Sequence, residues 1–383
     1  MRIVFVANTS WYLCNFRMRL MKILVNEGHS VHAIAPHDSY SSQFTENGVT
    51  YNPLFISRSG TNPFNELRTV LGLKRILIEI AADIVFSYTP KGNIYSLLAA
   101  PLKITTIVPN ISGLGSVFVR KGIVTTIQKY LYRISLGRAK YVFFQNNEDR
   151  NLFLKLKYVE AKYSKRLPGS GVDIERFQPS FLHEENVLAD LTSQHTQPFR
   201  FILVGRLLWN KGIGEYVEAA KIIRERHPES EFTLLGFIDE SNPDSVPRRQ
   251  IIQWEKEGII RYLGETVDVE PYLASADCSI LPSYYMEGVP RSLLESAAMG
   301  LPVITTNSTG CRDVVEDSKT GFLVKPRSAE DLAAKMNIVL GMTASQRLAM
   351  GKAAREKMEL EFNEKIVLDS YLDIVKKVRE AMS

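Results

Sequence analysis

The stretch "RFILVGRLLWNKG", residues 200–212, joins a continuous apolar run to a basic loop. Residues 200–205 predict a buried strand, and a helical pattern follows from Gly212 to Arg226. Further strands are predicted at "EFTLLG", "IIRYLG", "CSILP", "PVITT" and "GFLV", with helical segments between most of them, and residues 328–383 form three successive helical patterns. Continuous apolar strands that alternate with helices are typical of a parallel sheet covered on both faces.

The first part of the chain shows the same alternation, from the strand "RIVFVA" at residues 2–7 to "YVFFQ" at 141–145. Helices are predicted over 16–26, 64–81, 93–100 and 123–136. Between the two parts, "LPGSGVDIERFQPS" at 167–180 is rich in Gly, Pro and Ser and predicts a hinge. The chain is therefore expected to form two doubly wound α/β domains, with a ligand where the loops at the carboxyl ends of both sets of strands face each other.

Composition limits the class of protein. A chain of 383 residues is too long for one core, and its 45% hydrophobic and 23% charged residues suit a globular protein. The three cysteines stand far apart without a CxxC pair, which argues against a disulfide framework or a zinc site and favours a reducing cytoplasm. The amino terminus does not resemble a signal peptide, and no apolar run is long enough to span a membrane.

Charge is distributed unevenly along the chain. Residues 1–170 hold 22 Lys and Arg against nine Asp and Glu, whereas residues 171–383 hold 25 against 33. A basic half beside an acidic half indicates that the first half faces something anionic, for which a membrane surface, a phosphorylated substrate and nucleic acid are the candidates. Nucleic acid is disfavoured, because the sequence has no motif of interleaved aromatic and basic residues.

Familiar nucleotide and metal motifs are missing from the sequence. It contains neither G-x-G-x-x-G after a strand nor G-x-x-x-x-G-K-[ST], and no Asp-x-Asp pair that would hold a metal against a diphosphate. A metal-free diphosphate site needs cationic side chains, and Arg206 and Lys211 stand in the loop after the strand at 200–205. Arg binds phosphate oxygens in a bidentate manner and Lys adds a compact charge.

A second stretch, "YYMEGVPRSLLESAAMG" at 284–300, predicts a helix that begins near Pro290. The start of this helix presents the backbone N–H groups of Gly288, Val289 and Arg291 to an anion, and the helix dipole adds to the attraction. Gly288 also permits close approach of the backbone to a ligand.

Two glutamates bracket this helix start. Glu295 lies among apolar neighbours, so it either pairs with Arg291 four residues earlier or binds the hydroxyls of a ribose. Glu287 precedes the helix and can reach past the phosphates to the group attached to them. A carboxylate there can accept hydrogen bonds from sugar hydroxyls and stabilise positive charge that develops at an anomeric carbon.

Together, "VGRLLWNKG", "LPSYYMEGVP" with its E-x7-E pair, "AMGLPVITTNSTGCRDVV" and "GFLV" resemble glycosyltransferase family 4. These are retaining enzymes of the GT-B fold, in which two Rossmann-like doubly wound domains face each other across a cleft. The resemblance implies that Arg206 and Lys211 hold the donor diphosphate, that Glu295 binds the ribose and that Glu287 contacts the donor sugar.

The resemblance also implies roles for backbone groups and for the domains. Gly288, Val289 and Pro290 present backbone to sugar and phosphate, and Thr266 lies near the base. The last helix crosses back, so that residues 1–170 with 366–383 form an acceptor-binding domain and residues 171–365 form the nucleotide-sugar-binding domain. No metal and no cofactor are expected beyond the UDP-sugar, which is the donor substrate.

Two departures from the usual family pattern restrict the resemblance to one branch of the family. The segment "NISGLGSVF" has Asn110 and Ser112 where many family members have a His, and "NTSWYLCNFR" replaces the usual Gly-Gly loop. Both features resemble the branch that builds bacterial surface polysaccharides and lipid-linked oligosaccharides, including those that receive α-1,3-linked GalNAc in bacterial N-glycosylation. In such a site the backbone of Gly113, Leu114 and Gly115 is expected to touch the donor.

The basic first half then has an acceptor to bind. Arg17 is expected to meet the pyrophosphate of a polyprenyl-linked saccharide, and "VFVRKG" at 117–122 is expected to lie at an anionic membrane surface. The expected activity is transfer of a hexose or N-acetylhexosamine, with GalNAc as the best guess, from a UDP-sugar to this acceptor at the inner face of the cytoplasmic membrane. A UDP-sugar 2-epimerase and a non-catalytic sugar-nucleotide-binding protein are the alternatives.

Overall fold

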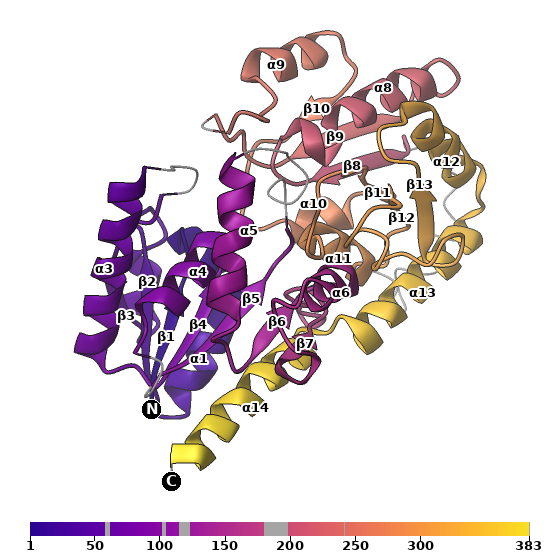
Figure 1. Cartoon of the computed structure of the whole chain (residues 1–383). Helices are drawn as coiled ribbons and strands as arrows, with labels where there is room; N and C mark the ends of the chain where they lie inside the picture. The colour runs from indigo at the N-terminus through magenta and orange to yellow at the C-terminus, as the bar shows by residue number, and fades with distance from the viewer. Residues whose placement is uncertain (58–61, 102–104, 115–122, 180–197, 241, 383) are drawn as a thin grey trace. The chain divides into compact units, whose positions relative to one another are not determined.

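Two separate parallel sheets organise the chain in the computed structural model, which describes residues 1–57, 62–101, 105–114, 123–179, 198–240 and 242–382. Unit 1 comprises Met1–Ser170 and Val367–Ser383, and unit 2 comprises Gly171–Ile366. Both units are visible in Figure 1 and are described here one at a time. The sequence analysis placed the return to the first domain at residue 366, one residue before this division.

The seven-stranded sheet of unit 1 has the order β3-β2-β1-β4-β5-β6-β7, and its neighbouring strands are parallel. Its strands are β1 (Arg2–Val6), β2 (Ser30–Ala35), β3 (Thr50–Pro53), β4 (Ile84–Tyr88), β5 (Thr106–Ile111), β6 (Val142–Phe144) and β7 (Ser164–Arg166). Its helices are α1 (Ser10–Asn26), α2 (Ser42–Glu46), α3 (Pro63–Ile80), α4 (Pro90–Ala99), α5 (Ile123–Leu136) and α6 (Asn147–Lys155).

The six-stranded sheet of unit 2 is also parallel, in the order β10-β9-β8-β11-β12-β13. Its strands are β8 (Arg200–Val204), β9 (Glu231–Leu235), β10 (Arg261–Tyr262), β11 (Cys278–Leu281), β12 (Val303–Thr306) and β13 (Gly321–Val324). The principal helices are α8 (Ile213–Arg224), α9 (Arg248–Lys256), α10 (Glu270–Ala274), α11 (Arg291–Ala298), α12 (Ala329–Gly341) and α13 (Ala344–Glu361).

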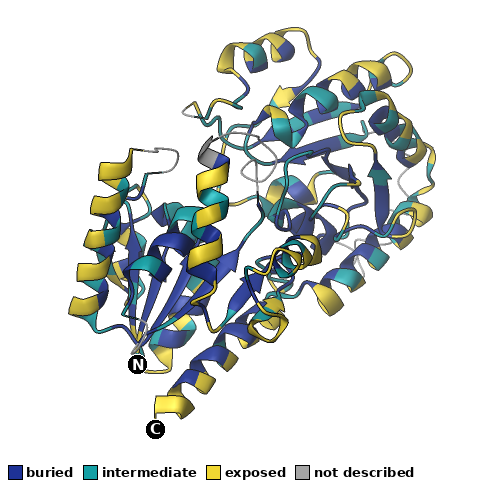
Figure 2. Cartoon of the chain, in the orientation of Figure 1, coloured by how far each residue is buried: buried dark blue, intermediate teal, exposed yellow. Residues whose placement is uncertain are grey.

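Strand side chains build the cores. In β1 the alternate residues Ile3 and Phe5 point to one apolar cluster, and Val4 and Val6 point to another, so both faces of the sheet are covered. Figure 2 shows the strands of both sheets as the most buried layer. The last helix, α14 (Glu364–Met382), contributes its apolar side chains from Val367 onward to the core of unit 1.

Some predicted boundaries were wrong. The first helix was expected to begin at Phe16, but α1 begins at Ser10 because the Thr9 side chain caps it, accepting a hydrogen bond from the Tyr12 N–H at 3.1 Å. The strand predicted at "IIRYLG" is reduced to Arg261–Tyr262, and the sequence analysis did not predict β7 or α6.

Each sheet reverses its strand order at one point, between β1 and β4 in unit 1 and between β8 and β11 in unit 2. Open parallel sheets bind ligands at the carboxyl ends of the strands beside such a switch. In unit 2 the loops at this position are residues 205–212 and 282–290, the two segments singled out from the sequence. Across the described ranges, no helix is both long enough and apolar enough to cross a membrane.

Candidate functional site

The carboxyl edge of the unit 2 sheet brings Lys211 and Glu287 together. Lys211 Nζ contacts Glu287 Oε1, and the two side chains are only 13% and 12% exposed. Glu287 Oε1 also accepts a hydrogen bond from Ser283 Oγ at 3.0 Å. The pair spans the switch between β8 and β11, and so places a cation and a carboxylate where a ligand of this fold binds.

Backbone contacts hold the two loops against each other. The Asn210 carbonyl accepts hydrogen bonds from the N–H groups of Tyr284, at 3.0 Å, and Tyr285, at 3.1 Å. Gly212 is the N-cap of α8, with φ of +79°, and a Cβ added there would lie 2.3 Å from the carbonyl oxygen of Pro282. A residue with a side chain therefore does not fit without moving the β11 loop, and the glycine keeps Lys211 close to Glu287.

Arg206 follows β8 directly and lies at the same edge. Its side chain is 38% exposed, and its Nη1 lies 3.7 Å from Oδ2 of Asp239 in the loop after β9. The sequence analysis missed Asp239, although "GFIDESNPD" after the strand at 231–235 is an acidic loop at the expected edge. Arg206 therefore presents a partly exposed guanidinium at the site, and Asp239 partly balances its charge.

Glu295 lies on α11 and is 8% exposed. Arg291 Nε donates to its Oε1 at 2.7 Å, so the pairing with Arg291 that the sequence left open is present. Burial raises the pKa of Glu295, and the positive charges of Arg291 and Arg176 oppose that rise. Within the described chain Glu295 Oε2 makes no hydrogen bond, which leaves one carboxylate oxygen able to accept a hydroxyl of a ligand.

The helix starts one residue later than the expected start at Pro290. Pro290 is the N-cap with extended backbone, α11 begins at Arg291, and no side chain caps the helix. Gly288, Val289 and Pro290 are all buried. The helix N-terminus therefore offers backbone N–H groups rather than a side-chain cap, as an anion site requires.

The loop after β12 holds the Glu287 segment through hydrogen bonds to its backbone. Thr306 Oγ1 and Ser308 Oγ both donate to the carbonyl of Ser283, the latter at 3.0 Å. Gly310 has φ of +78°, and a Cβ added there would lie 2.1 Å from the Gly288 carbonyl oxygen and 2.8 Å from that of Glu287. The sequence analysis assigned no role to these residues, because they act through the backbone of the neighbouring loop.

Thr266 lies in the loop after β10, where its Oγ1 accepts a hydrogen bond from the Asp268 N–H at 3.0 Å. Arg176 Nη2 donates to Asp268 Oδ1 at 3.1 Å. Because the charge of Arg176 also acts on Glu295, this arginine links the Thr266 turn to the α11 site. Arg176 lies in "GSGVDIERFQP", a segment that the sequence analysis used to place the hinge but not the site.

In unit 1 Arg17 lies in an aromatic environment that the sequence did not predict. The residue is 2% exposed, and its guanidinium lies 4.7 Å from the Tyr88 ring centroid and 5.6 Å from that of Tyr371. Its Nη1 donates to the carbonyl of Phe16 at 2.7 Å. The guanidinium therefore packs on aromatic rings, which the sequence did not predict, and the role of Arg17 at the acceptor pyrophosphate stays a prediction.

The segment after β5 is partly described. Asn110 is fully buried and its Nδ2 donates to the Tyr371 hydroxyl at 2.7 Å, which gives this residue a structural role. Gly113 has φ of +101°, and the Leu114 side chain packs in the core of unit 1. Gly115 and the segment 117–122 lie outside the described residues, so their predicted roles remain predictions.

The arrangement in unit 2 suits an anionic ligand with a polar group attached. Arg206, Lys211 and the start of α11 supply positive charge, and the carboxylate of Glu287 lies beside them. Among the residues that the structure describes, no group of three His, Cys, Asp or Glu side chains could hold a metal ion.

Comparison with protein families gives two matches. Residues 2–146 match the family model described as glycosyl transferase 4-like, and residues 190–357 match glycosyl transferases group 1. The second match contains Arg206, Lys211, Glu287 and Glu295.

Two curated relatives resemble most of the chain. N,N'-diacetylbacillosaminyl-diphospho-undecaprenol alpha-1,3-N-acetylgalactosaminyltransferase from Campylobacter jejuni is 27% identical, over 99% of both chains. UDP-Gal:alpha-D-GlcNAc-diphosphoundecaprenol alpha-1,3-galactosyltransferase from Escherichia coli is also 27% identical, over 81% of this chain and 80% of its own length. Among solved structures, Anabaena HepE in complex with UDP and glucose has a TM-score of 0.77 at 16% identity, over 98% of this chain and 99% of its own.

Proposed function

Because the chain belongs to the glycosyltransferases, with a glycosyl transferase 4-like first part and a glycosyl transferases group 1 second part, we propose that it is a retaining GT-B enzyme that uses a UDP-sugar. The observation that carries this proposal is the Lys211–Glu287 pair at the switch point of unit 2. A cation for the diphosphate and a carboxylate for the sugar stand side by side there, beside the start of α11.

The proposed reaction is transfer on one face of the donor sugar. An acceptor hydroxyl oxygen forms a bond to the anomeric carbon on the side from which the diphosphate departs, and the bond from that carbon to the phosphate oxygen breaks. The departing phosphate oxygen takes the proton of the acceptor hydroxyl. Lys211 and Arg206 stabilise the charge that builds on the diphosphate, and Glu287 holds the sugar and stabilises the positive charge near its anomeric carbon.

The proposed acceptor is a saccharide linked through a diphosphate to a polyprenol, and the proposed donor is UDP-GalNAc. Both curated relatives are named for acceptors on diphospho-undecaprenol, and the one that matches the full chain is named for GalNAc transfer. The HepE complex contains UDP, which supports UDP as the nucleotide part of the donor.

A screen of donors tests this proposal directly. UDP-GalNAc is expected to raise the melting temperature of the protein more than UDP-galactose or UDP-GlcNAc at equal concentration, because a ligand that binds only the folded state stabilises it. Turnover is then measured with each donor on a diphospho-undecaprenol-linked saccharide. Transfer from none of the UDP-sugars, with no stabilisation by UDP, would contradict the proposal.

Transfer is expected to be the same in EDTA as in excess Mg²⁺. The reason is that Arg206, Lys211 and the start of α11 provide the positive charge that a metal gives to a diphosphate in other sites. Initial rates are measured with fixed donor and acceptor after dialysis against EDTA. A loss of activity that Mg²⁺ restores would show that these groups are insufficient.

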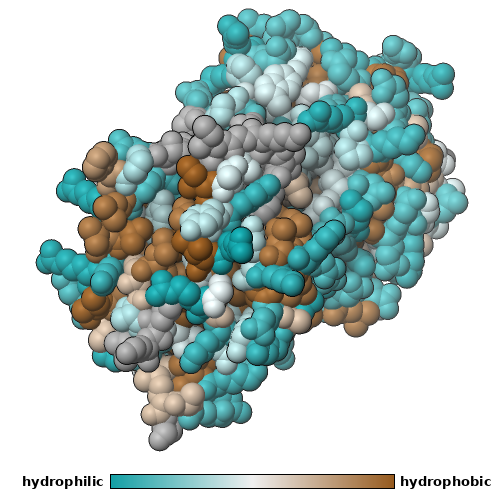
Figure 3. Space-filling view, viewed as in Figure 1, coloured by the Kyte–Doolittle hydropathy of each residue, from teal (hydrophilic) through white to brown (hydrophobic). Residues whose placement is uncertain are grey.

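We propose further that unit 1 binds an anionic membrane surface through a face formed by α3 and α5. Both helices pack beside α4, and both expose apolar residues at helical spacing. On α5 these are Ile127, Tyr130 and Ile134, which are 43–61% exposed; on α3 they are Phe64, Leu67, Leu71 and Ile78, each more than half exposed. Figure 3 shows the apolar surface over these helices.

Basic residues accompany the apolar stripes, with Lys74 and Arg75 on α3, where Arg75 pairs with Glu79, and with Lys129 and Arg133 on α5. Apolar side chains flanked by cations suit the boundary between headgroups and acyl chains in an anionic bilayer. Tyr132 and Leu136 pack α5 on the core of unit 1, whereas Ile127 and Tyr130 are exposed, and this exposure supports the proposed membrane contact.

The double substitution Ile127→Glu with Ile134→Glu is expected to reduce binding to vesicles of phosphatidylglycerol and phosphatidylethanolamine at least about tenfold, since it removes buried apolar area and adds repulsion. Sedimentation with vesicles measures the bound fraction. Leu360→Glu is the control, because Leu360 is 71% exposed on α13 of unit 2. Equal binding by the wild type, the α5 double variant and the Leu360→Glu control would exclude the α5 face as the membrane contact.

A further inference from the structure

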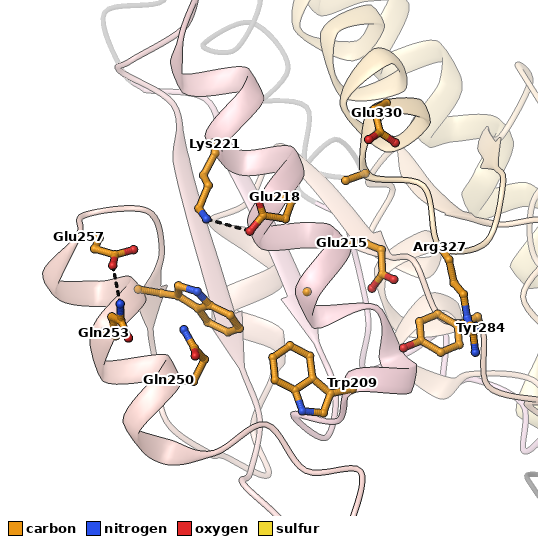
Figure 4. A pocket seen from close by; sticks show the side chains of 13 residues that line it. Trp209, Glu215, Glu218, Lys221, Gln250, Gln253, Glu257, Tyr284, Arg327 and Glu330 are labelled. Carbon is orange, nitrogen blue, oxygen red and sulfur yellow. Dashed lines mark hydrogen bonds and ion pairs between the residues drawn. The ribbon is translucent and has the colours of Figure 1, made fainter.

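A groove on unit 2 lies outside the residues assigned to the donor. It has a volume of about 610 Å³, within the roughly 300–1,000 Å³ of ligand pockets. Its walls come from α8, α9, the start of α12 and the loops after β8, β11 and β13, as Figure 4 shows. The lining residues are Trp209, Gly214, Glu215, Glu218, Lys221, Gln250, Gln253, Trp254, Glu257, Tyr284, Arg327, Ala329 and Glu330.

Aromatic side chains form one part of the groove. Trp209 is 37% exposed, and its ring meets that of Trp254 edge to face, with centroids 6.0 Å apart. Tyr284 lies on the other side of Trp209 from the α9 residues in Figure 4, with the Arg327 guanidinium 4.5 Å from its ring centroid. A partly exposed indole offers a flat apolar surface beside polar groups, which suits the C–H face of a pyranose ring.

Polar side chains that donate hydrogen bonds and others that accept them surround these rings. Lys221 donates to Glu218 and Gln253 donates to Glu257, each at 2.8 Å. Gln250 and Glu215 extend the set along α9 and α8 (Figure 4). A sugar hydroxyl both donates and accepts, so a mixture of ammonium, amide and carboxylate groups matches it.

The charges in the groove distinguish between ligand classes. Four carboxylates face two cations, an excess of negative charge that opposes a phosphate or a nucleotide. A polyamine or a basic peptide is also a poor match, because Lys221 and Arg327 lie in the same groove and Lys221 already engages Glu218. A neutral ligand rich in hydroxyls is repelled neither by the carboxylates nor by the two cations.

We propose that this groove binds a neutral saccharide at a site separate from the donor site. One wall of the groove is the turn that contains Trp209, two residues before Lys211, and Tyr284 donates its N–H to the Asn210 carbonyl of the same turn. A saccharide in this groove therefore contacts the turn that holds Lys211 against Glu287. The inference concerns binding and does not depend on the transfer reaction.

Tryptophan fluorescence tests the proposal, because the chain has only three tryptophans and two of them line the groove. In the full-length Trp11→Phe protein, the emission comes from Trp209 and Trp254 alone. Titration with α-1,3-galactobiose, chitobiose and maltotriose is expected to give a saturable change with at least one of them. UDP binding, followed by calorimetry, reports on the donor site independently.

Two double variants on α9, made in the Trp11→Phe protein, test whether the fluorescence change comes from saccharide bound in the groove. Gln250→Ala with Gln253→Ala removes two amides from the groove and is expected to weaken saccharide binding about tenfold, with UDP binding unchanged. Arg249→Ala with Lys256→Ala changes exposed residues of the same helix that do not line the groove, and is expected to change neither.

Three results would overturn the proposal: no saturable change with any saccharide, equal weakening by both double variants, or a response to spermidine but not to saccharides. If the Trp11→Phe protein binds a saccharide but does not bind UDP, the proposed transferase function is contradicted. The assignment of the groove to a saccharide is not affected by that result.

Discussion

Replacing Glu287 with alanine is expected to lower sugar transfer by at least about 10²–10³-fold while unit 2 stays folded. The side chain is mostly buried beside Lys211 and Ser283, and its carboxylate stands next to the groups proposed to hold the diphosphate. The substitution removes the carboxylate proposed to stabilise positive charge near the anomeric carbon. Initial rates with UDP-GalNAc and a diphospho-undecaprenol-linked saccharide measure the effect on kcat and KM.

Two further variants separate the chemical effect from a structural one. Glu287→Gln keeps an oxygen that can accept from Lys211 and Ser283, so it is expected to fold like the wild type yet remain strongly impaired. Glu229→Ala removes an exposed carboxylate elsewhere in unit 2 and should leave the rate unchanged. Wild-type turnover in Glu287→Ala would exclude the role assigned to this residue.

Gly310→Ala is expected to destabilise unit 2 and to reduce transfer, although Gly310 carries no reacting group. The left-handed backbone alone costs about 1–3 kcal/mol for a residue with a side chain. A Cβ there would also lie 2.1 Å from the carbonyl oxygen of Gly288, so the loop that carries Glu287 must move. The melting temperature and the urea midpoint measure the first effect, and kcat/KM measures the second.

Gly258 provides a matched control for the backbone cost. It has φ of +68°, and a Cβ added there would meet no atom within 4 Å. Gly258→Ala should therefore show the conformational cost without the clash, and without loss of transfer in the surviving folded protein. Equal stability and equal activity of the two variants would mean that the contact between Gly310 and the Glu287 loop is unimportant.

The alternation of strands and helices could be predicted because apolar runs of strand length are legible in a single sequence. The loop residues Arg206, Lys211 and Glu287 were located for the same reason, since each follows a strong strand at the carboxyl edge of its sheet. The direct pairing of Lys211 with Glu287 was not predicted. Residues 76 positions apart meet only because β8 and β11 are neighbours, and strand order is not readable from local pattern.

Other predictions depended on details that local pattern does not contain. Arg17 was expected to meet the acceptor pyrophosphate, and its burial against the rings of Tyr88 and Tyr371 was not predicted, because both rings come from other elements of the chain. For Glu295 the sequence supported both a pair with Arg291 and contact with a ribose, and the structure contains the pair. Asp239 and Arg176 were missed because their importance comes from neighbours on other loops.

The last helix has a consequence for the order in which the protein can assemble during synthesis. Tyr371 fills the unit 1 core, with its ring centroid 4.9 Å from those of Phe86 and Phe143, and its hydroxyl accepts from buried Asn110. Residues 1–170 therefore leave the ribosome without part of their own interior, and the whole of unit 2 is translated before that part arrives. Emergence of α14, rather than emergence of residues 1–170, is therefore the step at which unit 1 can complete its fold.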